Sequence, residues 1–158
     1  MENTEIPAAD VTWSGNTVYD VPNGFECEAG GKSSSQSLTC RVYNNTAYLG
    51  SEAAIVTGTG CTQPIAWDVR NNILDTTHVT YIPSVCSNRT VTWDYNDDCG
   101  SQGTCTSSYT GTHDMEGINP LYINALGDPP DFDLHSWSSL INRGQWGLTN
   151  GNNDIGAY

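Results

Sequence analysis

The chain has 158 residues, enough for a single domain with a buried core, and its 18 acidic residues outnumber 5 lysines and arginines, giving a formal net charge of −13. Such a surface repels nucleic acid and anionic lipid over about 8 Å at physiological ionic strength, so a nucleic-acid-binding protein is excluded. An anionic polysaccharide would be repelled as well unless a cation intervened. No apolar run approaches the roughly 20 residues of a transmembrane helix, so no membrane span is expected.

A polar lead-in, residues 1–10, precedes four segments that share one pattern. Each segment is centred on an asparagine: Asn16, Asn45, Asn72 and Asn96. Three residues before each asparagine lies a large apolar residue: Trp13, Val42, Val69 and Trp93. The asparagines are 29, 27 and 24 residues apart. A drifting period of this size is typical of a solenoid, with one supersecondary unit per repeat.

The type of solenoid follows from what the repeats lack. The leucine columns of leucine-rich repeats are missing, and so is the amphipathic helical pattern of α-solenoids. A coil that turns sharply between two short strands needs a residue that tolerates the left-handed region, as Asn does. Stacked coils would place the asparagine side chains in a ladder along the axis. We therefore predict an all-β protein, a parallel β-helix of about four coils.

The coils are expected to begin near Val11, Leu38, Pro64 and Thr90. In the fourth coil Asp97 and Asp98 take the positions that apolar or Thr residues hold in the others. Because the burial of unpaired carboxylates costs several kcal/mol, the chain is expected to leave the coil path there. Residues 99–112 would be the excursion.

The two ends of the stack differ in the sequence. Residues 11–117 hold the coils, and residues 118–158 are expected to cover the C-terminal end, because a solenoid end exposes apolar side chains and strand edges. No comparable cap precedes residue 11. The N-terminal coil is therefore expected to be open to another chain, through which the protein could self-associate.

Six cysteines without a zinc-type pair indicate an oxidising compartment. Six cysteines allow 15 connectivities, of which coil position favours one. The predicted disulfides are Cys61–Cys86, on successive coils, Cys99–Cys105, across the excursion, and Cys27–Cys40 by elimination. Residues 1–7 lack the features of a signal peptide, so the chain is interpreted as part of a longer exported protein, extracellular or at the cell surface. A cytosolic protein with reduced thiols is the alternative.

Two sequons, at Asn44 and Asn88, are candidate glycosylation sites. Asp94, Asn96 and Asp98 place oxygen ligands at alternate positions, as a calcium loop does. The glycine of such a loop comes one place late, and no bidentate Glu follows. Calcium is therefore one interpretation of this turn, and a solvated acidic turn is the other; no other cofactor is expected.

Two stretches resemble a known family. Val42-Tyr-Asn-Asn-Thr-Ala47 and Val69-Arg-Asn-Asn-Ile-Leu74 resemble coils of the right-handed parallel β-helix proteins of the pectate-lyase-like superfamily. The tail, from Gly111-Thr-His-Asp-Met-Glu-Gly117 to Asp154-Ile-Gly-Ala-Tyr158, resembles the C-terminal end of secreted β-helix proteins of the choice-of-anchor Q kind. That family usually reads Gly-Ser-Pro-Ala-Ile-Asp where this chain reads Trp137-Ser-Ser-Leu-Ile-Asn142. The resemblance spans about residues 11–158 and implies a right-handed coil, but it leaves the function open, because the superfamily holds lyases, hydrolases, adhesins and inert stalks.

No catalytic residue is assigned. Lyases of the superfamily use an Arg or Lys base with calcium, and among the basic residues only Arg70 lies in the aligned part of a coil. The Asn-Thr-Asp and Gly-His-Gly runs of the glycosidase relatives do not occur. The competing function is nonetheless a fragment of a polysaccharide lyase or glycoside hydrolase.

The aromatic residues suggest binding instead. Trp13 and Trp93 are expected to point inward, whereas Tyr43 and Tyr95 lean outward, where they could contact a sugar or a partner. We therefore expect a non-catalytic portion of an exported cell-surface or fibre-forming protein that binds a polysaccharide or other glycan, or neighbouring subunits. A purely structural spacer is a third interpretation.

Overall fold

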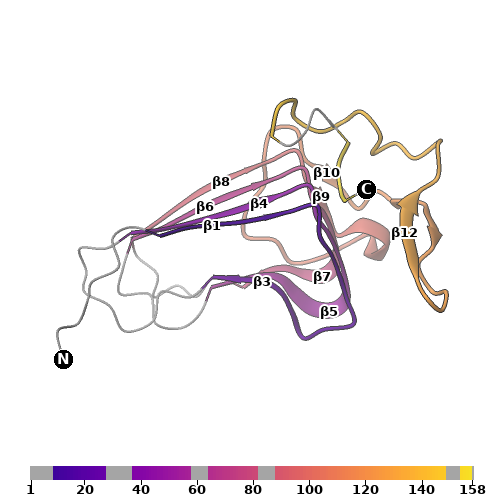
Figure 1. Ribbon diagram of the computed structural model, residues 1–158, viewed down its shortest axis with the longest axis horizontal. Coiled ribbons are helices and arrows are strands. Elements are labelled where there is room, and N and C mark those ends of the chain that lie inside the picture. Colours follow the sequence, from indigo (N-terminus) through magenta and orange to yellow (C-terminus); the bar gives the residue numbers. More distant parts are fainter. Residues whose placement is uncertain (1–8, 28–36, 58–63, 82–87, 149–153, 158) are drawn as a thin grey trace.

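The structure, a computed structural model, describes residues 9–27, 37–57, 64–81, 88–148 and 154–157. These residues form an all-β protein built mainly from two parallel sheets (Figure 1). Within them the one helical element is a short 3-10 turn, η1 (Gly100–Gln102). None of the helical structure in these ranges is long and apolar enough to cross a membrane.

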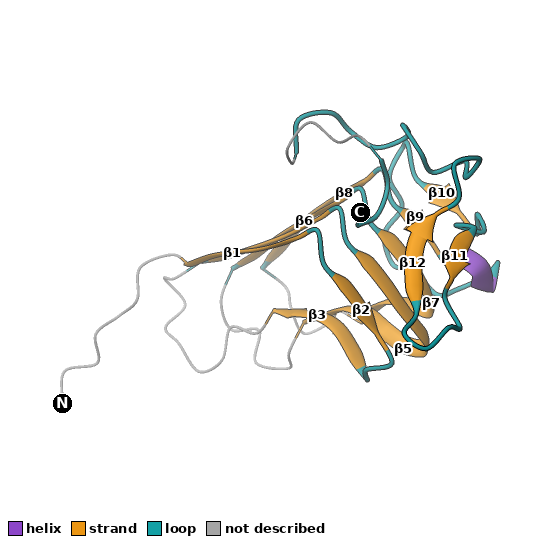
Figure 2. Ribbon diagram, turned by 45° about the vertical axis from the view of Figure 1, so that its right-hand side comes forward, coloured by secondary structure: helices purple, strands orange, loops and turns teal. Residues whose placement is uncertain are grey.

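Sheet A consists of four parallel strands in the order β1-β4-β6-β8. Their bounds are β1 (Ala9–Ser14), β4 (Leu38–Tyr43), β6 (Ile65–Arg70) and β8 (Arg89–Asp94). Sheet B has the order β10-β9-β7-β5-β2, and β3 also pairs with β5. Its strands are β2 (Thr17–Tyr19), β3 (Asn23–Cys27), β5 (Thr46–Thr57), β7 (Ile73–Tyr81), β9 (Asp97–Asp98) and β10 (Met115–Glu116). An antiparallel hairpin, β11 (Tyr122–Asn124) and β12 (Asp131–Leu134), lies beside sheet B (Figure 2).

Each of the four repeats gives one strand to sheet A, bends at its asparagine and gives the next strand to sheet B (Figure 1). The register matches the columns of the sequence, since Val42 pairs with Trp13 on one side and with Val69 on the other. Val69 pairs in turn with Trp93. The repeats predicted from the sequence are therefore real units of pairing.

The core lies between the two sheets because alternate side chains of each strand point toward the other sheet. Val42, Val69 and Trp67 of sheet A are buried, as are Leu74 and Ile55 of sheet B. Each large apolar side chain that is fully buried contributes roughly 1.5–3 kcal/mol.

The two tryptophans of the aligned column point inward, as expected. Trp93 is buried in the core, and Trp13 packs against it with its ring 6.2 Å from that of Phe25. They therefore fill the ends of the core rather than form an outer ridge.

The prediction that the chain leaves the coil path at Asp97 and Asp98 is wrong. Both residues pair in register with the third repeat, Asp97 with Ile73 and Asp98 with Leu74, and they are 0% and 3% exposed. Burial raises the pKa of Asp97 to about 9 and that of Asp98 to about 8. The acids are thus neutral at pH 7 and avoid the cost of a buried charge. Asp97 Oδ1 accepts a hydrogen bond from the Ile118 N–H (3.2 Å).

The end of the stack beyond the fourth repeat is covered by residues 99–117, which contain the predicted excursion, residues 99–112. Tyr109 stacks on Trp93 with ring centroids 5.9 Å apart. The segment then returns to sheet B, where β10 pairs with β9. The excursion therefore does the capping that we expected of residues 118–158.

The described part of residues 118–158 lies instead against the outer face of sheet B. Ile73 packs there with Leu134, Leu140 and Ile155. At the first two repeats, Phe132 of β12 contacts the rings of Tyr19 and Tyr48. The tail takes this place because the outward residues of sheet B include large apolar and aromatic side chains that water would otherwise surround.

Two of the predicted disulfides are present, Cys27–Cys40 and Cys99–Cys105. Cys61 and Cys86, the third predicted pair, lie outside the described residues. Disulfides in an all-β chain are compatible with an extracellular protein.

Candidate functional site

The turns between the sheets are held by a ladder of asparagine side chains. The Oδ1 atoms of Asn45, Asn72 and Asn96 each accept hydrogen bonds from the backbone N–H and the Nδ2–H of the asparagine one repeat earlier. These distances are 3.0 and 3.0 Å from Asn16 to Asn45, 3.0 and 3.0 Å from Asn45 to Asn72, and 3.1 and 2.9 Å from Asn72 to Asn96. The ladder therefore has a direction: donors point toward the C-terminal end, and acceptors toward the N-terminal end.

The ladder ends on an acid that the sequence comparison missed. Asp114 Oδ1 accepts a hydrogen bond from the Asn96 N–H (2.8 Å), and the Met115 N–H donates to the Asn96 carbonyl (2.7 Å). The same backbone bond joins the earlier repeats, so Asp114 occupies a fifth ladder position. It escaped notice because Asp replaces Asn and lies only 18 residues after Asn96.

The residue before each ladder asparagine, and not the asparagine itself, adopts the left-handed conformation. The four φ angles are 67° for Gly15, 52° for Asn44, 58° for Asn71 and 59° for Tyr95. Gly and Asn tolerate this region, but for a bulky residue it is an outlier. Since backbone strain concentrates at functional sites, Tyr95 marks the fourth turn as a candidate site.

Tyr95 is held in place by the neighbouring acid and histidine. The Asp94 carboxylate accepts hydrogen bonds from the Tyr95 N–H (3.1 Å) and the His113 N–H (2.7 Å). The His113 Nδ1 lies 2.8 Å from Asp94 Oδ2, and its ring stacks on Tyr95 at 4.4 Å and 11°. Burial alone would raise the pKa of Asp94, but these hydrogen bonds lower it. The aromatic pair is therefore fixed before any ligand arrives.

The stacked pair opens into a cleft of about 540 Å³, which we call the Tyr95 cleft. It is lined by Tyr95, His113, Asp114, Met115, Asn142, Arg143, Gly144 and Trp146. Trp146 is 70% exposed and Arg143 is exposed. The cleft thus offers the exposed ring of Trp146 and the half-buried ring of Tyr95 beside hydrogen-bond donors and acceptors.

The far wall of the cleft is pinned to the third repeat. The Gln145 N–H donates to Asn71 Oδ1 (2.7 Å), and Asn71 Nδ2 donates to the Gln145 carbonyl (3.0 Å). Arg70 also donates to Gln145 Oε1 (3.0 Å). These bonds set the position of Trp146, one residue later.

Asp114 links the cleft to the ladder. Burial raises the pKa of Asp114, although hydrogen bonds from the Asn96 and Gly111 N–H groups oppose that shift. Asp114 thus completes the ladder through its Oδ1 atom and also lines the cleft.

The residues of the candidate calcium turn are held by separate partners. Asp94 bonds to His113, Asn96 belongs to the ladder, and Asp98 Oδ2 accepts from the indole N–H of Trp93 (3.2 Å). No group of three or more His, Cys, Asp or Glu side chains suited to a metal ion occurs in the part of the chain that the structure describes. The calcium interpretation stays a prediction.

Tyr43 and Tyr95 do not form one site. The Tyr43 hydroxyl donates to Asp68 Oδ2 (2.5 Å), and burial together with Asp68 raises its pKa to about 12. Tyr43 does not line the Tyr95 cleft. Tyr95 is therefore the contact that the cleft contains, and Tyr43 stays a prediction outside it.

The two sequons differ in accessibility. Asn44 is 5% exposed, and its Nδ2 donates to the Asp154 carbonyl (3.1 Å). A glycan on that nitrogen would break the bond and displace the tail, so the folded structure argues against modification at Asn44. Asn88, just before β8, is exposed and stays a candidate.

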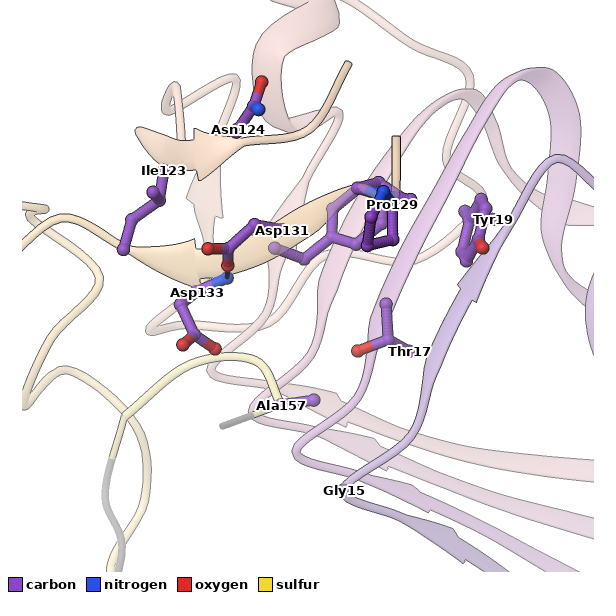
Figure 3. A pocket seen from close by; sticks show the side chains of 11 residues that line it. Gly15, Thr17, Tyr19, Ile123, Asn124, Pro129, Asp131, Asp133 and Ala157 are labelled. Atoms are coloured by element: carbon purple, nitrogen blue, oxygen red, sulfur yellow. Dashed lines mark hydrogen bonds between the residues drawn. The ribbon is translucent and has the colours of Figure 1, made fainter. Parts of the chain in front are cut away.

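A second cleft, of about 690 Å³, lies between β2 and the hairpin (Figure 3). Thr17 and Tyr19 form one wall, and Asp131, Phe132 and Asp133 of β12 form the other. Tyr19 is 48% exposed. We call this the edge cleft, because β2 is the last strand of sheet B.

Of the residues that line the cleft the sequence singled out only Tyr95, and those that it missed include His113, Asp114, Arg143 and Trp146. They come from two segments about 30 residues apart that only the fold brings together. One signal was available for the first two: His113 and Asp114 occupy the positions that Tyr95 and Asn96 hold in the fourth repeat.

Comparisons with family models, with curated proteins and with solved structures found no match for this chain.

Proposed function

We propose that the chain is a non-catalytic part of an exported cell-surface or fibre-forming protein and that it binds a glycan in the Tyr95 cleft. We propose further that its repeats form a right-handed parallel β-helix of the pectate-lyase-like kind. The parallel register over four repeats and the unbroken asparagine ladder support the architecture. The two disulfides support export.

The observation that carries glycan binding is the presence of two aromatic rings and polar side chains in one cleft. The Tyr95 ring is backed by His113, and Trp146 stands 70% exposed on the opposite segment. A sugar ring is amphipathic, with apolar C–H faces that pack on aromatic rings and hydroxyls that pair with polar side chains. Arg143 and Asn142 supply donors at the same cleft. Because Asp94 and Gln145 hold the walls, little ordering is needed on binding.

The charge of the chain favours a neutral glycan. With a formal charge of −13, the protein repels polyanions over a Debye length. The cleft lining holds one Lys or Arg, Arg143, and one acid, Asp114, so it offers little cationic surface for a chain of uronates. We therefore infer that the ligand is a neutral oligosaccharide.

Titration of the chain with neutral oligosaccharides, followed by calorimetry and by amide NMR, tests the proposal. Tyr95→Asn places at this turn the residue that the second and third repeats carry, so the fold is kept and the ring is lost. We expect this variant and Trp146→Ala each to weaken binding at least about tenfold, which corresponds to about 1.4 kcal/mol.

Trp137→Ala is the matched control, because Trp137 is also exposed, at 69%, but stacks on His135 outside the cleft. Its affinity should equal that of the unmodified chain. Binding that survives both cleft variants, or no binding by any neutral oligosaccharide, would overturn the proposal.

A catalytic function is favoured by one observation, the Asp94–His113 pair at the mouth of the cleft. Arg70, the base suggested by its place in the coil, is engaged by Asp68 at 2.6 Å and by Gln145. His113 is therefore the better candidate for a base. Release of unsaturated or reducing-end products from polysaccharides with calcium present, lost in His113→Gln, would establish an enzyme and replace the binding proposal.

A further inference from the structure

We propose that the free edge of β1 and β2 docks a strand–turn–strand segment of another polypeptide, parallel to the first repeat and with an asparagine at its turn. The inference rests on the proposed repeat architecture and is independent of glycan binding. β1 and β2 are the last strands of sheets A and B. Among the described residues none pairs with their outer edges.

The direction of the ladder specifies what the docked turn must present. At every later repeat the asparagine Oδ1 accepts two hydrogen bonds from the preceding asparagine, but no described residue donates to Asn16 Oδ1, and Asn16 is exposed. The residue after each ladder asparagine donates its N–H to the preceding asparagine carbonyl, at 2.9 Å for both Thr46 and Ile73. The equivalent Thr17 N–H has no acceptor within the described ranges. An asparagine turn supplies two donors and one carbonyl acceptor, which satisfy both groups.

The opposite end of a second copy does not match this edge. There the ladder finishes on Asp114, whose Oδ1 is an acceptor and whose side chain has no Nδ2–H to give. Stacking that end on Asn16 would bring two acceptors together. The partner is therefore a repeat with Asn where the last position of this chain has Asp, and not the C-terminal end of a second copy.

The residues that line the edge cleft (Figure 3) indicate which side chains would suit the partner. Thr17 and Tyr19 belong to the outward columns of sheet B, since Thr17 pairs with Thr46 and Tyr19 with Tyr48. The next members of these columns, supplied by the docked segment, would lie in the cleft opposite Asp131 and Asp133. The cleft has no Lys or Arg in its lining. Hydroxyl-bearing or basic residues therefore suit the outward positions of the partner.

A peptide that copies residues 38–49 of this chain, with Cys40→Ser, serves as the probe. Binding of the labelled peptide to the full chain is measured by fluorescence anisotropy, and its position by amide NMR shifts at Asn16 and Thr17. We expect saturable binding, at least about tenfold weaker for the peptide with Asn45→Ala and for the chain with Asn16→Ala. A peptide with Thr46→Lys, which faces the edge-cleft carboxylates, should bind several-fold more tightly at low salt.

The chain with Trp146→Ala is the control and should bind the peptide normally. Far-UV circular dichroism verifies that Asn16→Ala leaves the fold intact. No binding at millimolar peptide, equal affinity for the Asn45→Ala peptide, or self-association of the chain that buries Asn16 would each overturn the proposal. Loss of peptide binding with glycan binding retained would refute this inference alone, because the two sites share no residue.

Discussion

The third and fourth repeats share a backbone and differ in most of the side chains that surround it. Both have a fully buried ladder asparagine, Asn72 and Asn96, and their strands pair in one register. Where the third repeat buries Ile73 and Leu74, the fourth buries two acids. The comparison teaches that backbone pairing and the ladder determine the path of the chain. They outweigh the cost of burying the carboxyl groups of Asp97 and Asp98.

The largest effect of a single substitution is expected from breaking the ladder that the two repeats share. Asn72→Ala removes side-chain bonds to Asn96 Oδ1 and to two strand carbonyls, and leaves the Asn45 N–H without its acceptor. Unsatisfied buried groups cost 1–3 kcal/mol each, so we expect a loss of roughly 3–5 kcal/mol in the free energy of unfolding by urea. Asn16→Ala, at the exposed end, should cost about 1 kcal/mol or less. Equal losses would contradict a buried, cooperative ladder.

The second effect is the pH dependence of stability that the buried acids of the fourth repeat cause. The third repeat lacks it, because Leu74 stands where the fourth repeat has Asp98. Folded Asp97 and Asp98 have pKa values of about 9 and about 8, against an ordinary value of 3.8. Between pH 4 and pH 9 the folded chain therefore holds protons that the unfolded chain releases, and stability falls as the pH rises. The slope is up to about 1.4 kcal/mol per pH unit for each group. Urea unfolding from pH 5 to 9 should show this decline.

The double variant Asp97→Asn with Asp98→Asn tests the cause of the decline. It keeps the shape of both side chains and cannot ionise. Its stability should change much less over the same pH range and should exceed that of the unmodified chain at pH 8. A decline of the same slope in the variant would locate the titrating groups elsewhere.

The third effect concerns the left-handed residues, Asn71 in the third repeat and Tyr95 in the fourth. Asn71→Gly removes two hydrogen bonds to Gln145 and should lower the free energy of unfolding by about 2 kcal/mol. Tyr95→Gly loses the stacking on His113 but relieves a strained backbone, so the net change should stay within about 0.5 kcal/mol. A large loss in Tyr95→Gly would mean that Tyr95 is a structural residue and not a contact for ligand.

The smallest effect is expected at Asp94, which has no carboxyl counterpart in the third repeat. Its lowered pKa stabilises the fold above the ordinary value of 3.8, and that contribution is lost as the pH falls through the folded pKa. Since His113 is half exposed, Asp94→Asn should cost no more than about 1 kcal/mol. Calorimetric melting should show a lower Tm for the variant at pH 7 and a smaller difference near pH 3.

Much of the fold was predictable because the pattern that carries it is local. The spacing of Trp13, Val42, Val69 and Trp93 from their asparagines gave the register of both sheets. Two predicted disulfides are present, Cys99–Cys105, which was placed across the excursion, and Cys27–Cys40, which was assigned by elimination. The burial of Asp97 and Asp98 was not predictable from this local pattern. A sequence shows that a residue is acidic, but it does not show that burial will neutralise the side chain.

The candidate site was harder to predict than the fold. Tyr95 was singled out, but its partners His113 and Trp146 reach it only through the excursion and the tail, whose paths have no repeat to reveal them. The left-handed position was assigned one residue too late, because the sequence contains Asn-Asn at two turns and cannot tell which of the pair bends the chain. Tertiary packing decides both points.

The most direct test of the account is the ionisation of the two buried acids, followed by NMR of the ¹³C-labelled aspartate carboxyl carbons against pH. If the fourth repeat stays in the sheets, the Asp97 and Asp98 signals remain those of protonated acids at pH 6.5 and titrate at about 9 and about 8. If both carboxyls titrate near the ordinary value of 3.8, the chain leaves the sheets after Asn96, and the fourth repeat does not have the structure described.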